Sequence, residues 1–412
     1  MNDPTKTVDV PERPSGARYE RRRLEIIDAA TRALSRDGVR GMRLAAVASQ
    51  LGLTTNSVSY YYRRKEDLAV ACFEAALEVM GGMIDEAAQA GAPPARVGRF
   101  LELYLQAHAR MRRGEQPPIS IFSDLRTLTE PQLGQMEAAY KAMQRQAAAL
   151  FEGPGLDWMD QPARLARAQL LLEQGYWSEV WLPRYSLDDL PRVHARLCDI
   201  LLNGLAGPGR AWAPAPLAAL APGAGQAPAQ ENFLKAATRL VNQRGYRGAS
   251  VSGIAAELNV TKGSFYHHHH AKDELVLACF RRSYRTMRSA QRAVREAPGD
   301  EWLRLSTAVA SLVEHQFLPE GPLLRTSALA AIPPEMRMEA ARMSRRVTDH
   351  FAAMIADGIA EGSLRAVDPA IAAEALAATI NAASDLPFHM PVDAATIAEL
   401  YARPLLVGLF TE

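Results

Sequence analysis

Two short segments of the chain combine small hydrogen-bonding side chains with aromatic and basic ones. They read TTNSVSYYY from Thr54 and TKGSFYHHH from Thr261. Hydroxyl and amide groups suit the edges of base pairs in a DNA groove, and ammonium and imidazole groups suit phosphate oxygens. The chemistry on offer is therefore recognition of DNA. The side chains that provide it are Thr54, Thr55, Asn56, Ser57 and Tyr60 in the first segment and Thr261, Lys262, Ser264, Tyr266 and His267 in the second.

The same order of helices is expected around each segment. An amphipathic helix comes first and should stop at Gly38 or Gly245, where a helix end favours a residue with positive φ. A second short helix is expected over 43–50 and 250–257, followed by a tight turn. Thr54 and Thr261 are good N-caps for a third helix. This order predicts a helix-turn-helix whose last helix enters the major groove.

The two segments belong to one duplicated unit. A shift of 207 residues aligns 29–73 with 236–280 without a gap, and sixteen of these 45 positions are identical. A repeat of this length is a whole domain rather than a solenoid unit. The chain is therefore expected to carry the same DNA-binding head twice.

Positive charge is concentrated in the same two regions. The 412-residue chain has a formal net charge of +1, so the protein is not a general polycation. Residues 13–65, however, contain twelve Lys or Arg against four Asp or Glu, and residues 231–288 contain ten against four. Local excesses of this kind are what phosphate binding requires, whereas the alternative is a solvated helix face.

Composition places the chain in a broad class. Three cysteines without clustered spacing argue against a disulfide framework and fit a reducing cytoplasm. A polar start and the lack of a long apolar run argue against a signal peptide and a membrane span. Gly207–Gln230 is rich in Pro, Ala and Gly and is expected to be a flexible interdomain linker.

These residues resemble the N-terminal domain of the tetracycline-repressor (TetR) family. The resemblance rests on Ala29-Ala30, Gly38, Gly52-Leu53, Tyr60-Tyr61-Tyr62 and Lys65-Glu66-Asp67-Leu68, and on Ala236-Ala237, Gly245-Tyr246, Thr261–His268 and Lys272-Asp273-Glu274-Leu275. It implies an all-α protein in which each three-helix head is joined, by a fourth helix from about Lys65 or Lys272, to a helical effector-binding and dimerisation body.

The resemblance also implies roles for particular residues. Family members usually contact phosphate through a Tyr, a neighbouring His and the Lys that opens the fourth helix. These correspond to Tyr266, His268 and Lys272 in the second copy. The first copy has Ser59 and Tyr61 at the first two positions and keeps Lys65, and Arg43 replaces the N-cap that Ser250 supplies. The full set implied for DNA adds Gly263 to the residues already named.

The implied organisation has six parts. They are a flexible tail (1–18), a first head (19–66), a first regulatory body (67–206), the linker (207–230), a second head (231–273) and a second body (274–412). Because family members pair as homodimers, one chain with two heads implies an intrachain pseudo-dimer, with a further homodimer left open. The pairing helices would be 164–183 with 190–205, and 369–385 with 394–409, although their apolar stripes could instead only complete each body's own core.

Two other features carry alternative interpretations. His267–His270 could suggest a metal site, but successive helical residues point in different directions, so no metal or other cofactor is expected. Cys72 and Cys279 match across the repeat and could form a redox sensor, although such a cysteine is more often a small buried hydrophobe.

The bodies offer apolar candidates for a ligand pocket. They are Phe122, Trp158, Tyr176, Trp177 and Trp181 in the first unit, and Trp302, His315, Phe317, Met336, Met354 and Phe388 in the second. Side chains at such spacing are more often plain core. If they line a pocket, its effector is hydrophobic. No motif of a nucleotide-binding loop, nucleophile elbow or zinc protease is present, so an enzyme is not expected.

The sequence therefore predicts a cytoplasmic transcriptional regulator, more a repressor than an activator, that binds a double-stranded operator and a small-molecule effector. Because the two recognition segments differ, the operator should be non-palindromic or imperfectly palindromic. The alternative is a sensor or interaction protein whose first head no longer binds DNA.

Overall fold

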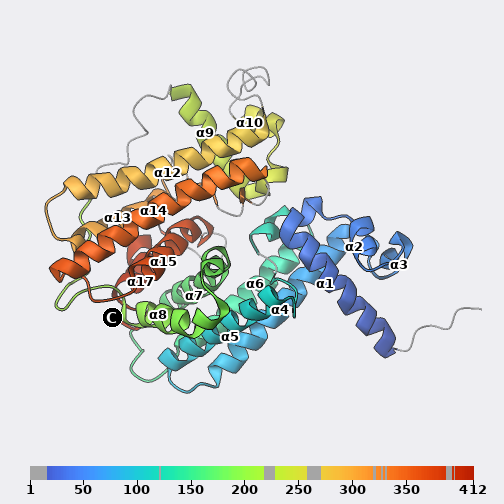
Figure 1. The fold of residues 1–412 in the computed structure, drawn as a ribbon, viewed down its shortest axis with the longest axis horizontal. Coiled ribbons are helices and arrows are strands. Elements are labelled where there is room, and N and C mark those ends of the chain that lie inside the picture. Colours follow the sequence, from blue (N-terminus) through green and yellow to red (C-terminus); the bar gives the residue numbers. More distant parts are fainter. Residues whose placement is uncertain are drawn as a thin grey trace, which may run out of the picture.

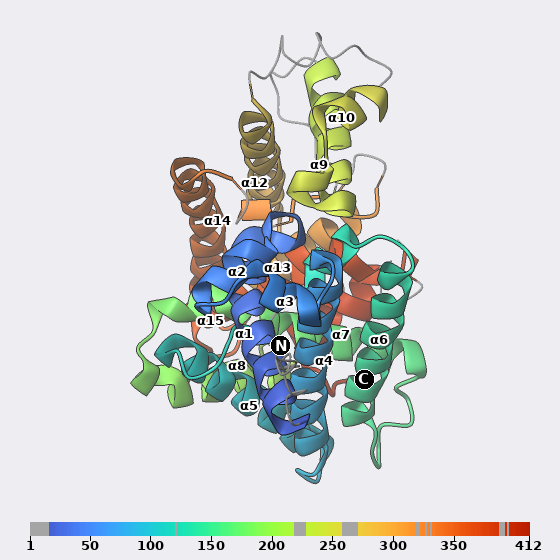
Figure 2. The same cartoon turned by 90° about the vertical axis from the view of Figure 1, so that its right-hand side faces the viewer.

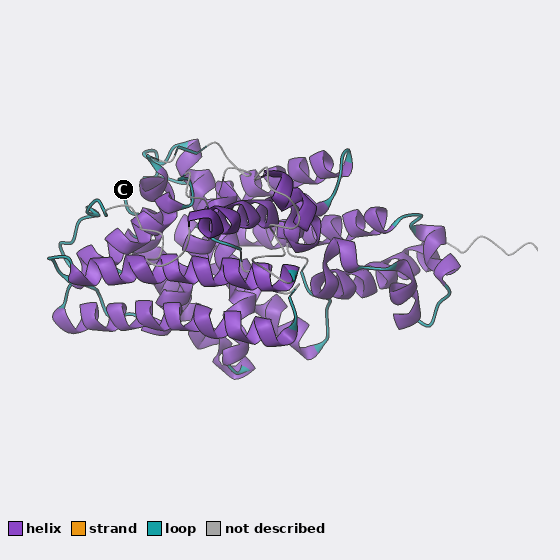
Figure 3. Cartoon of the chain, turned by 90° about the horizontal axis from the view of Figure 1, so that it is seen from above, coloured by secondary structure: helices purple, strands orange, loops and turns teal. Residues whose placement is uncertain are grey.

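The structure, a computed structural model, describes residues 16–119, 122–217, 228–257, 271–318, 322–325, 328–329, 332–386, 392–393 and 395–412. Over these ranges the chain forms helices and no sheet (Figure 3), which confirms the all-α prediction. Among the helices so described, none is long and apolar enough to cross a membrane.

The first unit runs from a small head into a helical body (Figure 1). Its helices are α1 (Gly16–Gly41), α2 (Leu44–Gln50), α3 (Thr55–Tyr61), α4 (Lys65–Ala88), α5 (Pro93–Arg113), η1 (Phe122–Thr127), α6 (Gln132–Ala148), η2 (Ala149–Phe151), α7 (Gln161–Trp181), η3 (Leu182–Arg184), η4 (Leu187–Asp189) and α8 (Leu190–Asn203). The first helix starts at Gly16, three residues before the head predicted to begin at residue 19.

The second unit repeats this order over its described residues. Its helices are α9 (Pro228–Gly248), α10 (Val251–Glu257), α12 (Lys272–Glu296), α13 (Glu301–His315), α14 (Pro334–Glu361), α15 (Pro369–Ala382), η6 (Ala383–Asp385), a π-helix η7 (Ala398–Ala402) and α17 (Arg403–Val407). The fourth helix of each unit begins at Lys65 and Lys272, as the sequence predicts.

The repeat is visible in the backbone as well as in the sequence. The first helix of each head kinks at its glycine, with φ 65° at Gly38 and φ 67° at Gly245. Only glycine takes such a conformation without strain, so both positions need it. Figure 2 shows the described helices of the two heads as separate groups, with α9 and α10 above α1, α2 and α3.

The two equivalent cysteines lie on α4 and α12, where these helices face the first helix of each head. The Cys72 thiol faces the Ile27 carbonyl oxygen at 3.7 Å, and the Cys279 thiol faces that of Leu234 at 3.6 Å. Burial raises the pKa of both thiols to about 12. Since the thiolate is the reactive form, both cysteines behave as small buried hydrophobes rather than as redox sensors.

The two bodies pack against each other through the last helices of each unit. Helix α7 packs on α15, and α8 packs on α15 and α17, so that these helices form the centre of the molecule (Figure 1). Helix α8 also packs on α5, so its apolar stripe serves its own body as well. The predicted segment 394–409 is irregular, because its described part forms η7 and the short α17.

Reciprocal backbone contacts close this junction. The amide of Leu205 donates to Leu406 O at 2.7 Å, and that of Leu409 donates to Leu201 O at 2.9 Å. A methyl group on Gly204 would lie 2.5 Å from Gly408 N, and one on Gly408 would lie 2.6 Å from Leu202 O. Each unit thus presents a glycine to the other's backbone at the same place.

The described part of the linker is docked on the second body. Gly207 N donates to Ser363 O at 3.0 Å, Ala215 N donates to Thr307 Oγ1 at 3.0 Å, and Trp302 Nε1 donates to Ala211 O at 2.8 Å. The segment 207–217 therefore differs from the flexible spacer expected from its composition. Helix α9 begins at Pro228, three residues before the predicted start of the second head.

Candidate nucleic-acid interface and effector site

The recognition helix of the first head is the short helix α3, which is capped at its N-terminus and packed along one side. The Thr54 hydroxyl accepts a hydrogen bond from Ser57 N at 3.2 Å, as predicted for an N-cap. Val58 is fully buried and anchors the helix on α2. The opposite side carries the predicted DNA contacts, so the helix presents a polar face without losing its packing.

The predicted contacts of α3 differ in exposure. Thr54, Thr55, Asn56 and Tyr60 are exposed, whereas Ser57, Ser59 and Tyr61 are half-buried. The exposed set provides hydroxyl, amide and phenol groups, which suit base edges and phosphate oxygens. Arg43 precedes α2 and gives no side-chain cap, in line with the departure noted in the sequence.

An aromatic cluster occupies the end of α3. The Tyr61 ring stacks on Tyr19 of α1, with centroids 4.8 Å apart, and Tyr60 meets Tyr61 edge-on at 5.3 Å. Tyr61 stands where the family has a phosphate-binding His, and here part of its ring is covered by another ring. Sequence reasoning missed Tyr19, because no pattern in α1 distinguishes a tyrosine that reaches α3.

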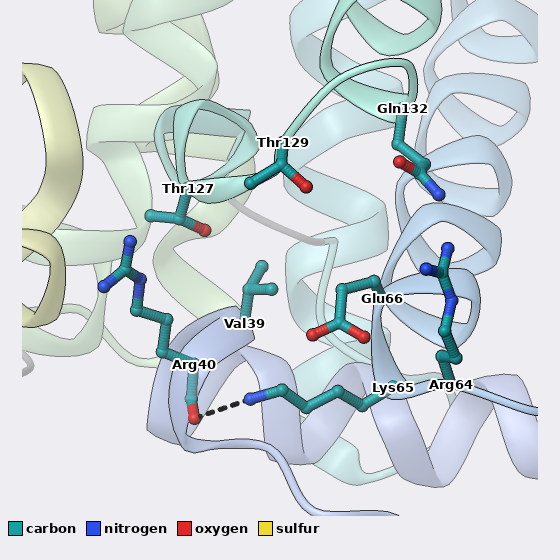
Figure 4. A pocket seen from close by; sticks show the side chains of 8 residues that line it. All are labelled: Val39, Arg40, Arg64, Lys65, Glu66, Thr127, Thr129 and Gln132. Atoms are coloured by element: carbon teal, nitrogen blue, oxygen red, sulfur yellow. Dashed lines mark hydrogen bonds between the residues drawn. The ribbon is translucent and has the colours of Figure 1, made fainter.

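A cavity of about 420 Å³ lies where the first head meets its body (Figure 4). Thr127 and Thr129 lie above Val39 in this view and Lys65 lies below it, while the Arg40 side chain extends toward Thr127. Lys65 Nζ donates to Arg40 O at 3.0 Å, so the end of α1 holds the ammonium group. The remaining lining residues are Val39, Arg64, Glu66 and Gln132.

The second head follows the family pattern in its described part. Ser250 Oγ accepts from Gly253 N at 3.0 Å and so caps α10, as the sequence predicts. Lys272 Nζ lies 4.2 Å from the ring centroid of Tyr246, whose hydroxyl bonds to Asp273. The other predicted contacts lie outside the described residues. They are Thr261, Lys262, Gly263, Ser264, Tyr266, His267 and His268.

The interior of the first body contains an aromatic cluster that includes two predicted pocket residues, Phe122 and Tyr176. The ring of Phe122 in η1 lies 5.3 Å from Tyr140, 5.7 Å from Tyr176 and 6.4 Å from Phe73. These rings come from η1, α6, α7 and α4, so Phe122 lies where four elements of the first body meet. Its role in ligand binding stays a prediction.

Polar side chains lie beside these rings. Gln169 Nε2 donates to Glu173 at 2.7 Å, and Tyr104 OH donates to Glu179 at 2.9 Å. Burial raises the pKa of both carboxyl groups to about 7. His108 is buried, neither ring nitrogen has a hydrogen-bond partner, and burial lowers its pKa to about 4.

Sequence reasoning named His315 and missed these polar residues. The repeat could have found His108, because the offset of 207 residues pairs it with His315. Two glutamates within an apolar stretch of α7 were a second signal. The paired histidine and the two glutamates both indicate that the interior of the first body is partly polar.

The other pocket candidates are dispersed. Trp158 lies under the Arg167 guanidinium at 5.2 Å, Trp177 donates to Glu374 across the unit boundary at 3.3 Å, and Trp181 meets Tyr185 edge-on. The second-unit candidates are at least partly buried: Trp302, His315, Phe317, Met336 and Met354. Phe388 lies outside the described residues, as does His267–His270, and the described part of the chain has no cluster of three metal-binding side chains.

Two sequence families match parts of the chain. The family described as bacterial regulatory proteins, tetR family, matches residues 26–72 and again 233–279. The tetracyclin repressor-like C-terminal domain matches residues 298–385. The Transposon Tn10 TetC protein of Escherichia coli is 39% identical over 59 residues, which are 13% of this chain and 30% of that protein.

Solved structures resemble about half of the chain at a time. A TetR family transcriptional regulator, PfmR from Thermus thermophilus, is 22% identical, with a TM-score of 0.37 over 43% of this chain and 98% of its own. The ketosteroid transcriptional regulator KstR2 of Mycobacterium tuberculosis is 18% identical, with a TM-score of 0.36 over 44% and 96%. AibR in complex with isovaleryl coenzyme A and operator DNA is 20% identical, with a TM-score of 0.35 over 41% and 94%.

Proposed function

Since the chain belongs to the tetracycline-repressor (TetR) family of bacterial regulatory proteins and carries the N-terminal unit of that family twice, we propose that it is a double-headed, sequence-specific transcriptional repressor. Its two unequal heads read one non-palindromic or imperfectly palindromic operator in the cytoplasm. The observation that carries the proposal is α3, a helix anchored by Val58 that turns Thr55, Asn56 and Tyr60 to solvent.

In this proposal the DNA-facing set is the one predicted from the sequence. Base edges are read from the start of each recognition helix, and Lys65 and Lys272 bind phosphate at the start of α4 and α12. Arg43 and Ser250 lie beside the same groove. Single base contacts are worth about 1–3 kcal/mol each, so loss of either head should weaken specific binding strongly.

Selection from random double-stranded DNA tests this function. The wild type should enrich one non-palindromic sequence at moderate salt. Asn56→Ala in the first head and Lys262→Ala in the second should each lose preference in a different half of the site, while Gln89→Ala, at an exposed position away from the heads, should change nothing. A wild type without any preferred sequence would overturn the proposal, and a perfect palindrome would indicate that two chains pair like heads.

The proposal includes an intrachain pseudo-dimer. The reciprocal contacts of Gly204 and Gly408 support it, because in a two-fold interface each partner offers the same surface to the other. Gly408→Ala would push a methyl group against Leu202 O, and Gly299→Ala, outside the junction, is a matched change at positive φ. Mass measurement in solution should give one chain per operator for the wild type. Two wild-type chains per operator would contradict this part.

The effector is proposed to be a hydrophobic small molecule that carries a hydrogen-bonding group and binds in the first body. The rings around Phe122 supply apolar surface, and Gln169, which lies within hydrogen-bond distance of the Tyr140 hydroxyl, supplies a polar group. Binding of acyl and aromatic carboxylic acids, followed by release of operator DNA, tests the proposal. Tyr176→Ala should abolish the response and Met354→Ala in the second body should preserve it, whereas the reverse result would place the site in the second body.

One observation favours the alternative that the first head no longer binds DNA. The Tyr61 ring, at the family's phosphate-binding position, is stacked on Tyr19. If this head is silent, Asn56→Ala will leave affinity unchanged while Lys262→Ala abolishes it. The selection experiment above therefore also decides between the two.

A further inference from the structure

The second head rests on the body of the first unit. The single short helix η1 packs against α1 of the first head and against α9 of the second. A methyl group on Gly245 would lie 3.0 Å from Thr127 of η1, and one on Gly248 would lie 3.2 Å from the Arg40 guanidinium. The two heads therefore share one support.

A buried ionic group ties η1 to the second unit. Arg126 of η1 lies 3.3 Å from the Asp385 carboxylate in η6, and Asp385 also pairs with Arg325. The three side chains are only 14%, 15% and 9% exposed. Removing one partner from such a group leaves a buried charge without a counter-charge, which costs free energy. The three side chains therefore resist moving apart.

From Arg325 the contacts continue into the second head. The Asn242 side chain of α9 donates to Leu323 O at 2.9 Å and accepts from Arg325 N at 3.1 Å. Asn242 is 8% exposed. The same asparagine therefore holds both edges of the segment 323–325, which is the segment that carries Arg325.

Body helices of the second unit fix this segment from the other side. Leu324 N donates to Ser283 Oγ of α12 at 2.8 Å, and Leu323 N donates to Gln316 Oε1 at 2.8 Å. Gln316 in turn donates to Ile380 O of α15 at 2.8 Å. Each backbone amide of 323–325 thus has a buried partner, so the segment has little freedom to shift alone.

The first unit lacks this arrangement. The offset of 207 residues places Ser35 at the position of Asn242, and the buried Ser35 hydroxyl has no hydrogen-bond partner. It also places Ala76 and Ala109 at the positions of Ser283 and Gln316. The connection is therefore specific to the second head.

We propose that Arg126, Asp385, Arg325 and Asn242 act as one connection that positions the second head on the first body. The connection fixes the distance between the heads, and with it the half-site spacing that the chain accepts. These are positioning residues, because none of them lies on a recognition helix. The effect on half-site spacing rests on the proposed DNA-binding function. The positioning of the second head on the first body does not.

Asp385→Asn and Asn242→Ser test the connection at its two ends. Asp385→Asn keeps the shape and removes the charge that both arginines share, and Asn242→Ser installs the first unit's residue. The matched control is Arg184→Gln, which breaks a pair with Glu374 that also crosses the units but touches neither head. Asp385→Glu, which keeps the charge, should retain wild-type behaviour.

The first readout uses no DNA. Spin labels at Ser49→Cys and Ala256→Cys, equivalent exposed positions on α2 and α10, report the distance between the heads while the native thiols stay buried. The wild type should give one narrow distance distribution, and Asp385→Asn and Asn242→Ser should broaden it, whereas Arg184→Gln should not. Equal width in wild type and both variants would overturn the proposal, as would equal broadening by Arg184→Gln.

The second readout is preference among operators whose half-sites are moved apart in steps of one base pair. The wild type should discriminate between neighbouring spacings by at least about fivefold, and the two connection variants should lose most of that preference while keeping their sequence preference. If the wild type enriches no DNA at all, the proposed function fails and the distance measurement still judges the connection. If Asp385→Asn does not fold, Asn242→Ser, which changes no charge, decides.

Discussion

The two heads share the order of their described helices but are attached to their long helices by different chemistry. In the second unit Glu231 of α9 pairs with Arg282 of α12 at 2.6 Å, and both side chains are at most 10% exposed. The offset of 207 residues places Leu24 and Ala75 at these positions in the first unit. The second head is thus held by a buried ion pair where the first has only apolar side chains.

Two positions in the bodies differ in the opposite sense. Helix α7 of the first body carries Glu173 and Glu179, whereas the same offset places the buried residues Ile380 and Leu386 in the second. Both bodies bury polar groups, among them Gln169 in the first and Arg325 in the second, so the difference lies in which equivalent positions are charged. After the duplication the two units therefore came to differ in where equivalent positions carry buried charge.

The largest expected effect is on the ion pair of the second head. Glu231→Gln leaves the Arg282 guanidinium buried without this carboxylate, which should destabilise the docking of α9 by about 3–5 kcal/mol. Hydrogen exchange should rise along α9 and stay unchanged along α1. The double variant Glu231→Leu with Arg282→Ala, which installs the first unit's residues, should recover most of the loss. Equal exchange in both helices would show that the heads are not held differently.

The next effect concerns the polar interior of the first body. The pKa of Glu179 is raised from 4.5 to about 7 by burial, so the native state binds its proton more tightly than the unfolded state does. Stability from this group is present at low pH and is lost as pH rises from 4.5 through 7, by up to about 3 kcal/mol. Urea unfolding at several pH values should show the slope in the wild type.

Glu179→Gln should reduce this pH dependence without removing it, because Glu173 titrates over the same range. Leu386→Gln, at the equivalent place in the second body, introduces a polar group that does not titrate and should leave the slope unchanged. If Glu179→Gln leaves the pH dependence of the unfolding free energy unchanged, this carboxyl group titrates normally, and the first body does not differ from the second at this position.

A smaller effect is expected at the DNA-facing end of α3. Tyr61→His restores the side chain that the family has at this position, and one new phosphate contact should strengthen binding by the first head by about 1 kcal/mol, or roughly fivefold. Tyr61→Phe keeps the stack on Tyr19 and serves as control. The affinity of each variant for the half-site of the first head is the measurement. A histidine variant that binds no better than phenylalanine would show that the inequality of the heads has another origin.

The smallest effect is on the buried hydroxyl of Ser35. Since it has no hydrogen-bond partner, Ser35→Ala should stabilise the first head by up to about 1 kcal/mol. Thr238→Ala in the second head should do the reverse, because that hydroxyl donates to Leu234 O at 2.7 Å. Urea titration gives both values. Destabilisation by Ser35→Ala would mean that the hydroxyl has a partner in solution.

Local features of the heads were open to prediction from the sequence alone. At Gly38 and Gly245, where the sequence predicts a helix stop, the structure has a kink and the helix runs on to Gly41 or Gly248. These kinks, the cap at Thr54 and the start of the fourth helix at Lys65 and Lys272 depend on backbone preferences of a few neighbouring residues. The duplication needed only the alignment of the chain with itself. For the same reason the family could be named before the fold was known.

What the sequence could not decide are contacts between distant residues. No sequence pattern near Arg126 or Asp385 predicts that the two side chains pair. The composition of 207–217 predicts a flexible spacer, but the segment is hydrogen-bonded to the second body. Phe122 and Tyr176 lie in one aromatic cluster, whereas Trp158, Trp177 and Trp181 contact other partners. The sequence could not separate the two groups, because an aromatic residue looks the same there whether it faces a ligand or its own core. The sequence by itself determined two heads of unequal chemistry. Only the tertiary structure decided that the second head is supported by the first body, because burial and charge pairing across 200 residues depend on how the helices pack.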